Sequence, residues 1–250
     1  MRVVTWNLWW RFGAWADRRK AILAVLRDLE PDLVGLQEVW SADGENLAEW
    51  LADELGLHWT WAPSPAPERW RRRIGDPSVD IGNAVLSRWP LREREVLRLP
   101  VPAELDDGRL ALHARTGPVS FVTAHLTSAP DASAVRARQA AALAEFARRA
   151  GPVIVTGDFN AEPDAPELRP LARDLRDAWT ESGTVEDAAT WDWDPELPYR
   201  PDGPRQAARI DYVRLGGPVT VRGARRAGDR PVDGVWPSDH AAVVVDLDHR

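Results

Sequence analysis

Short apolar runs that end in polar residues recur along the whole chain. Residues 153–155 are apolar and β-branched, and Gly157, Asp158 and Asn160 follow them. A run of this composition predicts a central strand that is covered on both faces. The glycine permits a turn, and Phe159 is free to point back into the core. We therefore expect both polar side chains to face one cavity at the end of this strand.

Five further predicted strands carry chemically reactive residues at or beside their ends. These strands span residues 2–6, 32–39, 119–125, 209–215 and 241–247. The reactive residues that belong to them are Asn7, Glu38, His125, Asp211, Asp239 and His240. A lone histidine is more often structural than catalytic, so its role depends on what converges with it. Strands without such residues are predicted at 58–61, 81–87, 95–99 and 109–115.

Apolar residues at helical spacing predict helices between these strands. The helices span residues 17–29, 45–55, 133–150 and 167–175. The first helix joins strands 2–6 and 32–39, as in a βαβ unit whose two strands run parallel. The carboxyl ends of parallel strands meet at one edge of a sheet, so Asn7 and Glu38 should lie close together. We also expect Asp158 and His240 to face solvent at strand ends.

Two stretches lack periodicity and are predicted to be loops. Residues 62–80 are rich in proline and arginine, with four arginines around Trp70. This stretch is either a solvated insertion or a clamp in which Arg71 and Arg73 bind phosphate, because the arginine fork suits phosphate oxygens. Residues 190–209 hold Trp191, Trp193 and Tyr199, and we place this second loop beside the cavity.

Composition narrows the possible functions. The 250 residues could form one large α/β or layered β domain or two small ones, and they suffice for a large core. We see no linker and expect a single domain over residues 1–250. The formal charge of −7, from 32 basic and 39 acidic residues, disfavours long nucleic acids bound through their phosphates. The lack of cysteine excludes disulfides, thiolate nucleophiles and cysteine-bound metals. No apolar segment is long enough to cross a membrane, and Met1 leads directly into a strand without a leader, so we expect a cytoplasmic monomer.

The polar residues at the strand ends form an oxygen-rich set. Carboxylates, carboxamides and imidazoles are supplied by Glu38, Asp158, Asp239, Asn7, Asn160, His125 and His240, and Asp211 can orient a histidine. Zinc sites usually recruit several His or Cys ligands, whereas Mg²⁺ binds a few carboxylate or amide oxygens. The set therefore favours Mg²⁺ or Mn²⁺ and metal-assisted hydrolysis. A Ser-His-Asp hydrolase that uses Ser238 is the competing chemistry, but it would lack a Gly-x-Ser-x-Gly elbow.

Six short motifs, in this order and approximate spacing, resemble those of the endonuclease/exonuclease/phosphatase family, the DNase I-like phosphoesterases. They are Thr5-Trp6-Asn7, Leu36-Gln37-Glu38, Thr123-Ala124-His125-Leu126, Gly157-Asp158-Phe159-Asn160, Arg209-Ile210-Asp211-Tyr212 and Ser238-Asp239-His240. The resemblance runs from Arg2 to about Leu247. It implies a four-layered α/β sandwich, in which two mixed sheets pack face to face with helices outside.

The resemblance also implies roles for the site residues. Glu38 would hold Mg²⁺, helped by Asn7 and Asp239. Asp158 would align and deprotonate the attacking water, and Asn160 would position that water or the phosphate.

The remaining roles concern the phosphate itself. His125 and His240 would bind the non-bridging oxygens as negative charge builds in the transition state, and Asp211 would orient His240. Arg109 resembles a family residue near the site, and with Arg71 and Arg73 it is a candidate to bind phosphate.

The motifs specify phosphoester hydrolysis but not the substrate. Residues 208–212 lack the Pro-Ala-Trp-Cys-Asp-Arg type segment of inositol-polyphosphate phosphatases, and Val39-Trp40 differs from the residues usual in exonuclease III-like enzymes. Gln37-Glu38-Val39-Trp40 looks closer to sphingomyelinase-like members. We therefore expect a small-molecule or lipid phosphoester as substrate. A DNA or RNA nuclease and a non-catalytic binding module on the same fold are the alternatives.

Overall fold

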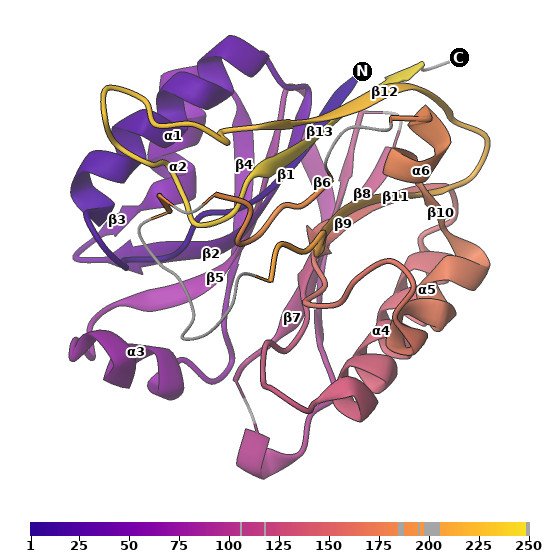
Figure 1. The fold of residues 1–250 in the computed structure, drawn as a ribbon, viewed down its shortest axis with the longest axis horizontal. Helices are drawn as coiled ribbons and strands as arrows, with labels where there is room; N and C mark the ends of the chain where they lie inside the picture. Colours follow the sequence, from indigo (N-terminus) through magenta and orange to yellow (C-terminus); the bar gives the residue numbers. More distant parts are fainter. Residues whose placement is uncertain (106, 118, 185–187, 195, 198–205, 249–250) are drawn as a thin grey trace.

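Two mixed β-sheets pack face to face and carry helices on their outer faces, as the family resemblance implies (Figure 1). The structure is a computed structural model that describes residues 1–105, 107–117, 119–184, 188–194, 196–197 and 206–248. Residues 195 and 198–205 of the predicted loop at 190–209, including Tyr199, lie outside these residues. No helix in the described part of the chain is long and apolar enough to cross a membrane.

The first sheet has the strand order β12-β13-β1-β2-β5-β4, and β3 pairs with β2. Its strands are β1 (Arg2–Asn7), β2 (Leu33–Ala42), β3 (Glu45–Asn46), β4 (His58–Pro63), β5 (Asp80–Ser87), β12 (Thr220–Ala227) and β13 (Ala242–Asp248). β1 and β2 run parallel and are joined by helix α1 (Trp15–Leu29), whereas the other pairs are antiparallel. The predicted βαβ unit is therefore confirmed.

The second sheet has the strand order β10-β11-β9-β8-β7-β6. Its strands are β6 (Leu91–Arg98), β7 (Leu110–Thr116), β8 (Val119–His125), β9 (Val153–Asp158), β10 (Arg176–Asp177) and β11 (Asp211–Gly216). β8 and β9 form its parallel pair, joined by helix α4 (Ser133–Arg149). Each sheet is thus built around a central βαβ unit.

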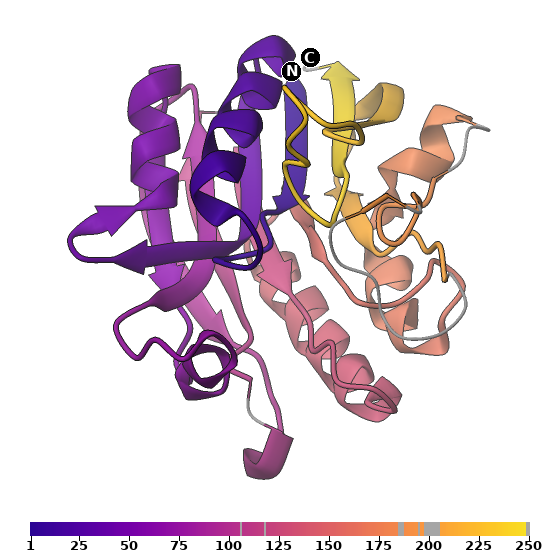
Figure 2. The same ribbon diagram turned by 60° about the vertical axis from the view of Figure 1, so that its left-hand side comes forward.

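Helices cover the outer face of each sheet (Figure 2). α1 and α2 (Leu47–Leu55) lie side by side over the first sheet, and α4 and α5 (Arg169–Asp174) lie over the second. The shorter helical segments are α3 (Glu68–Ile74), α6 (Ala178–Ser182) and the 3₁₀ turns Ala103–Leu105 and Pro166–Leu168.

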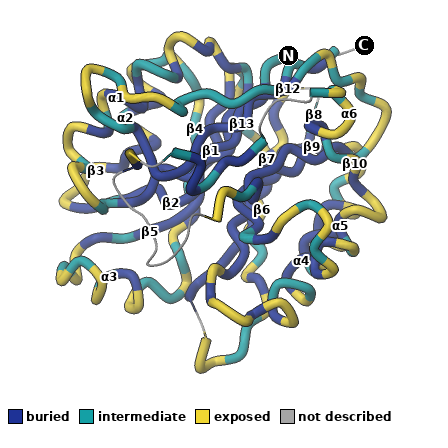
Figure 3. Tube along the Cα trace, viewed as in Figure 1, coloured by how far each residue is buried: buried dark blue, intermediate teal, exposed yellow. Residues whose placement is uncertain are grey.

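Three clusters of apolar side chains join the two sheets to each other and to their covering helices. One lies between α1, α2 and the first sheet, the second between the two sheets, and the third between the second sheet and α4. The central strands are buried along most of their length, whereas the edge strands β4, β6 and β12 are partly exposed and the helices keep an exposed outer face (Figure 3). Burial of apolar area in these layers is the main force that stabilises the fold.

The topology brings the polar strand ends to one edge. The parallel strands β1, β8 and β9 end there with Asn7, His125 and Asp158. β11 and β13 run antiparallel to β9 and β1, so their first residues lie at the same edge. Asp211 pairs directly with Asp158 in this register. His240 precedes β13 and reaches the same place.

A polar seam lies between the sheets beneath this edge. Gln37 on β2 donates to Thr5 Oγ1 at 3.1 Å and to Thr123 Oγ1, on the other sheet, at 2.8 Å. Gly35 is needed here, because a Cβ at this position would lie 2.2 Å from Thr156 Oγ1. The sheets therefore approach closely just below the site.

Several elements differ from the sequence-based prediction. The loop predicted at 62–80 contains α3, which ends at Gly75 in a left-handed conformation. Trp70 is the only buried residue of this helix, so the sequence shows no apolar periodicity from which the helix could be predicted. The second predicted helix begins at Leu47, because the Asn46 side chain accepts hydrogen bonds from two backbone N–H groups and caps it there. β3, β10, β12 and α6 were not predicted.

Arg18 ties together two loops that the sequence analysis did not connect. Its buried guanidinium donates to five carbonyl oxygens at 2.8–3.2 Å, which belong to Leu8, Trp9, Trp10, Phe12 and Pro237. Burial lowers the pKa of Arg18 to about 10. These loops follow Asn7 and precede Asp239, so this one side chain helps position both residues.

Replacing Arg18 should destabilise the protein strongly. In Arg18→Met, the five carbonyl groups lose a buried donor, and we expect the free energy of unfolding to fall by about 3 kcal/mol. The matched control is Arg27→Met on the same helix, whose guanidinium is exposed and pairs with Glu54. An exposed pair contributes at most about 1 kcal/mol. Urea denaturation of the three proteins gives the comparison, and equal midpoints for the two variants would contradict it.

Candidate active site

A cavity of about 1190 Å³ opens at the edge where the polar strand ends meet. Its lining includes Asn7, Glu38, His125, Asp158, Asn160, Asp239 and His240. Asp211 lies behind His240 and is not part of the lining. The structure thus brings together all eight residues that the sequence analysis placed in the catalytic and metal-binding sets.

Asp158 lies at the centre of this cluster. Its side chain is almost fully buried and accepts hydrogen bonds from Asn7 Nδ2 at 3.0 Å and from the backbone N–H of Asn160 at 2.9 Å. His125 Nε2 is 3.2 Å from Asp158 Oδ2. Burial opposes the charged carboxylate, but the two histidines outweigh it and hold the pKa of Asp158 well below its usual range. The expectation that this side chain faces solvent is wrong.

Asn160 connects Asp158 to the strand beside it. Its backbone is left-handed, with φ of 49°, and its Nδ2 lies 3.0 Å from the Leu126 carbonyl oxygen and 3.1 Å from His125 Nε2. The turn after β9 therefore holds the carboxamide beside His125. The carboxamide also lines the cavity, where its oxygen can accept a hydrogen bond.

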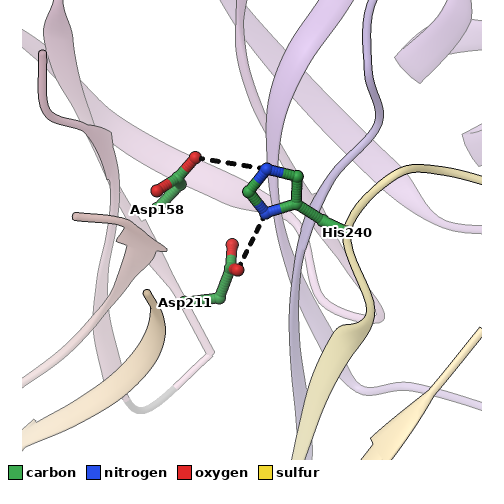
Figure 4. Close-up of side chains that lie close together, drawn as sticks. All are labelled: Asp158, Asp211 and His240. Atoms are coloured by element: carbon green, nitrogen blue, oxygen red, sulfur yellow. Dashed lines mark hydrogen bonds and ion pairs between the residues drawn. The ribbon is translucent and has the colours of Figure 1, made fainter. Parts of the chain in front are cut away.

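His240 lies between two carboxylates (Figure 4). Its Nδ1 is 2.9 Å from Asp211 Oδ2, and its Nε2 is 3.8 Å from Asp158 Oδ2. Burial disfavours a charged ring, but Asp211 and Asp158 outweigh it and raise the pKa of His240 to about 10. His240 is thus an imidazolium at neutral pH, and it is buried rather than facing solvent as predicted.

Thr190 holds Asp211 in place and was missed by the sequence analysis. Its hydroxyl donates to Asp211 Oδ2 at 2.6 Å and accepts from the backbone N–H groups of Ile210 and Asp211. Burial raises the pKa of Asp211, and the charge on Asp158 adds to this effect. Because Thr190 lies in an irregular stretch, no pattern in the sequence marks it.

A β-bulge aims Glu38 at the cavity. The register between β2 and β5 shifts between Leu36 and Val39, and Glu38 has a left-handed φ of 53°. In a regular strand Glu38 would point away from Gln37, which faces the other sheet. The bulge redirects the side chain to the edge. β2 continues to Ala42, so the prediction that Glu38 ends the strand is wrong, although its place beside Asn7 is as expected.

Glu38 and Asp239 form a second acidic centre in the cavity. Burial raises the pKa of Asp239 to about 7, and repulsion from Glu38 adds to the effect while His240 and Arg18 oppose it. Two buried carboxylates that repel each other suit a divalent cation, and the Asn7 carboxamide is a further oxygen donor. These residues therefore fit Mg²⁺ or Mn²⁺.

A second group of ligand atoms is also close together. One atom each from Asp158, Asp211 and His240 lies within 4.8 Å of the others. This group is compatible with a metal ion, but His240 Nδ1 and Asp211 Oδ2 already share a hydrogen bond that an ion would have to displace. The oxygen-rich Glu38 and Asp239 pair fits a hard cation better.

The alternative nucleophile, Ser238, has a structural role. Its hydroxyl donates to the Asn7 carbonyl oxygen at 2.6 Å and accepts from the His240 backbone N–H at 3.2 Å. It is fully buried and does not line the cavity. These contacts argue against a Ser-His-Asp hydrolase.

The three predicted arginines occupy different environments. Arg109 is buried, pairs with Asp107 at 2.7 Å and lines a small pocket beside Glu38 and His125. Arg73 lines the main cavity. Arg71 does not; its guanidinium pairs with Asp80 at 2.6 Å.

The family assignment rests on a comparison of the whole chain with known proteins. The family model described as "Endonuclease/Exonuclease/phosphatase family" matches residues 4–240. No curated protein matches the chain.

Several solved structures share the fold. A functionally unknown conserved protein from Enterococcus faecalis V583 has a TM-score of 0.78 and 17% identity, with 100% of both chains covered. The human Nocturnin catalytic domain with bound sulfate has a TM-score of 0.74 and 20% identity, covering 99% of this chain and 94% of that one. D. rerio TDP2 in complex with single strand DNA product has a TM-score of 0.76 and 20% identity, covering 100% and 99%. Identities this low show the fold alone, whereas the family model spans nearly all of the sequence, and the chain therefore belongs to the endonuclease/exonuclease/phosphatase family.

Proposed function

We propose that this protein is a Mg²⁺- or Mn²⁺-dependent phosphoesterase that hydrolyses a phosphodiester or phosphomonoester by attack of water on phosphorus. Members of its family are hydrolases that act on phosphoesters. The observation that carries the proposal is the buried Asp158 carboxylate at the cavity floor, held between His125 and the imidazolium of His240. An acceptor for water thus stands next to donors for phosphate oxygens.

Asp158 orients the attacking water through a carboxylate oxygen. Because its pKa is held low, the carboxylate is ionised at any working pH but is a weak base. Its main contribution is therefore alignment. The water becomes more acidic as its oxygen bonds to phosphorus, and it then gives its proton to Asp158. The Asn160 carboxamide oxygen, beside it, accepts a hydrogen bond from the same water and helps hold it in place.

His240 and His125 stabilise the negative charge that builds on the phosphoryl group. The His240 imidazolium can donate from Nε2 to a non-bridging oxygen while Asp211 fixes the ring through Nδ1. His125 donates from the neighbouring strand end. Arg109 lies in the adjoining pocket, but its charge is already balanced by the buried Asp107 carboxylate with which it pairs.

A divalent ion held by Glu38, Asp239 and Asn7 would supply further positive charge to the phosphoryl and leaving-group oxygens. Arg18 positions the two loops that carry Asn7 and Asp239, so it supports these ligands from behind. All of these groups are held in place before the substrate arrives, which is how electrostatic catalysis avoids reorganisation during the reaction.

The cavity walls favour a small-molecule or lipid phosphoester. Trp9, Phe12, Trp70 and Trp191 line them, and aromatic walls bind apolar or ring-containing groups. The net charge of −7 disfavours long nucleic acids.

A nuclease is the second candidate, because the fold is shared with D. rerio TDP2, whose structure contains a single strand DNA product. Cleavage of short single-stranded DNA that weakens steeply with added salt would favour a nuclease over an enzyme with a small-molecule substrate. A non-catalytic binding module is disfavoured because the predicted catalytic positions converge on one cavity.

Replacing Asp211 should impair turnover more than binding. Asp211→Asn keeps the shape but removes the charge that fixes the His240 imidazolium, so we expect kcat to fall about 10²–10⁴-fold with little change in KM. The assay is hydrolysis of bis-p-nitrophenyl phosphate and p-nitrophenyl phosphate with added Mg²⁺ or Mn²⁺. Asp177→Asn, at a carboxylate that pairs with Arg209 away from the cavity lining, is the control. Unchanged kcat in Asp211→Asn would show that the role of His240 is wrongly assigned.

Glu38 should be required for metal binding. EDTA should abolish hydrolysis and added Mg²⁺ or Mn²⁺ should restore it. Calorimetric titration of Glu38→Gln should show metal affinity at least about tenfold weaker than in the unchanged protein. Glu162→Gln serves as control, because Glu162 also lines the cavity but is remote in sequence from the acidic pair. Equal metal affinities in all three proteins would contradict the assignment of Glu38 as a ligand.

A further inference from the structure

One wall of the cavity carries two arginines that the proposed chemistry does not use. Arg69 and Arg73 on α3 line the cavity together with Phe12 and Trp70. We call these four residues the arginine wall. α3 lies at the periphery of the fold, away from the end of β9 that carries Asp158, in both ribbon views (Figures 1 and 2). The wall is therefore a separate part of the same cavity.

Arg69 and Arg73 share a face of α3. They are four residues apart, which places them side by side on a helix. Arg71 lies on a different face and pairs with Asp80. Among the described residues, neither Arg69 nor Arg73 has an ion pair or a hydrogen bond from its side chain. Two cations without a carboxylate partner thus face one cavity in a protein whose net charge is −7.

The guanidinium of Arg73 lies over two aromatic rings. Its guanidinium carbon lies 4.7 Å from the centroid of Phe12 and 5.5 Å from that of Trp70. Trp70 is itself fixed, because its indole N–H donates to the Asp107 carbonyl oxygen at 2.9 Å. Rings that cover the planar faces of a guanidinium leave its N–H edges to bind a ligand. Such an edge matches the oxygens of a phosphate.

The catalytic end of the cavity already has its own groups for a phosphate. His240, His125 and the Glu38 and Asp239 cation site serve the phosphoryl group that reacts. A cavity of about 1190 Å³ is also far larger than one phosphate requires. The arginine wall therefore has both the space and the charge for a different part of the substrate.

Building on the proposed function, we propose that the arginine wall is a second anion subsite and that the substrate is a phosphoester carrying a second phosphate group. The second phosphate contacts Arg69 and Arg73, and the portion between the two phosphates lies along Phe12 and Trp9. A nucleotide with two phosphates and a lipid head group with an additional phosphate share this chemistry.

Equilibrium binding tests the subsite without turnover. Thymidine 3′,5′-bisphosphate and thymidine 5′-monophosphate are titrated calorimetrically into the protein with EDTA in place of Mg²⁺, so that neither phosphomonoester is hydrolysed. We expect the bisphosphate to bind about tenfold more tightly, as one charge-assisted contact implies. Arg73→Gln should lose about tenfold in affinity for the bisphosphate and stay within about twofold for the monophosphate. Equal affinities of the unchanged protein for both nucleotides, with no lipid binding in the vesicle test below, would overturn the proposal.

Arg72→Gln is the matched control. Arg72 is exposed on the same helix, carries the same charge and does not line the cavity. The Arg72→Gln variant should bind both nucleotides as tightly as the unchanged protein does. An equal loss of bisphosphate affinity in Arg72→Gln and Arg73→Gln would mean that the charge acts at long range, and there would be no subsite.

A vesicle arm separates the two sources of the phosphate. Phosphatidylcholine vesicles with and without phosphatidylinositol 4-phosphate are sedimented with the protein and with Arg73→Gln. Binding that requires the second phosphate and is lost in Arg73→Gln identifies a lipid head group, whereas selective binding of the nucleotide alone identifies a soluble substrate. If the second phosphate increases binding of neither the nucleotide nor the vesicles, the proposal is overturned.

The two proposals can fail separately. If the protein hydrolyses no phosphoester but keeps its Arg73-dependent preference for a second phosphate, the proposed function is wrong and the subsite stands. If hydrolysis depends on Asp211 and Glu38 as expected but a second phosphate does not increase the affinity of any ligand, only the subsite proposal is wrong.

Discussion

The buried negative charge of Asp158 is the constraint on which the rest of the site depends. A carboxylate taken out of water must be balanced by hydrogen bonds and opposite charge. The balance comes from both sheets, through Asn7 at the end of β1, His125 at the end of β8 and His240 before β13. The charge is therefore tolerated only when the two sheets are packed in one register. The fold and the site therefore depend on the same packing of the two sheets.

Close backbone approach and local strain make this register possible. A Cβ at Gly157 would lie 1.9 Å from the Ala124 carbonyl oxygen. Only glycine at position 157 therefore lets β9 pair with β8 there. Glu38 and Asn160 both adopt left-handed backbone conformations that non-glycine residues seldom take. Such strain persists where the surroundings hold it, as the bulge in β2 and the hydrogen bonds of Asn160 do here.

The sequence predicted the strands well because each has a strong local signature. The βαβ unit around α1, the strand before Asp158 and the place of Glu38 beside Asn7 follow from apolar runs and from the geometry of parallel strands. That His125 and Asp158 belong to the same site was implied by the family resemblance. α3 was missed because one buried tryptophan gives no period. The solvent-facing prediction for Asp158 and His240 was wrong because a strand end is exposed only if nothing packs across it.

The sequence by itself determined which residues could do the chemistry, since apolar runs, turns and the order of six motifs are local properties of the chain. The tertiary structure decided what state those residues are in. Asn7 and Asp158 are 151 residues apart and Asp211 and His240 are 29 apart, yet these contacts set burial, charge and orientation. The same holds for Thr190 behind Asp211, for Arg18 across two loops, and for the arginines of α3, of which Arg71 is paired while Arg73 faces the cavity. Burial and pKa depend on neighbours in space, and no local pattern encodes those neighbours.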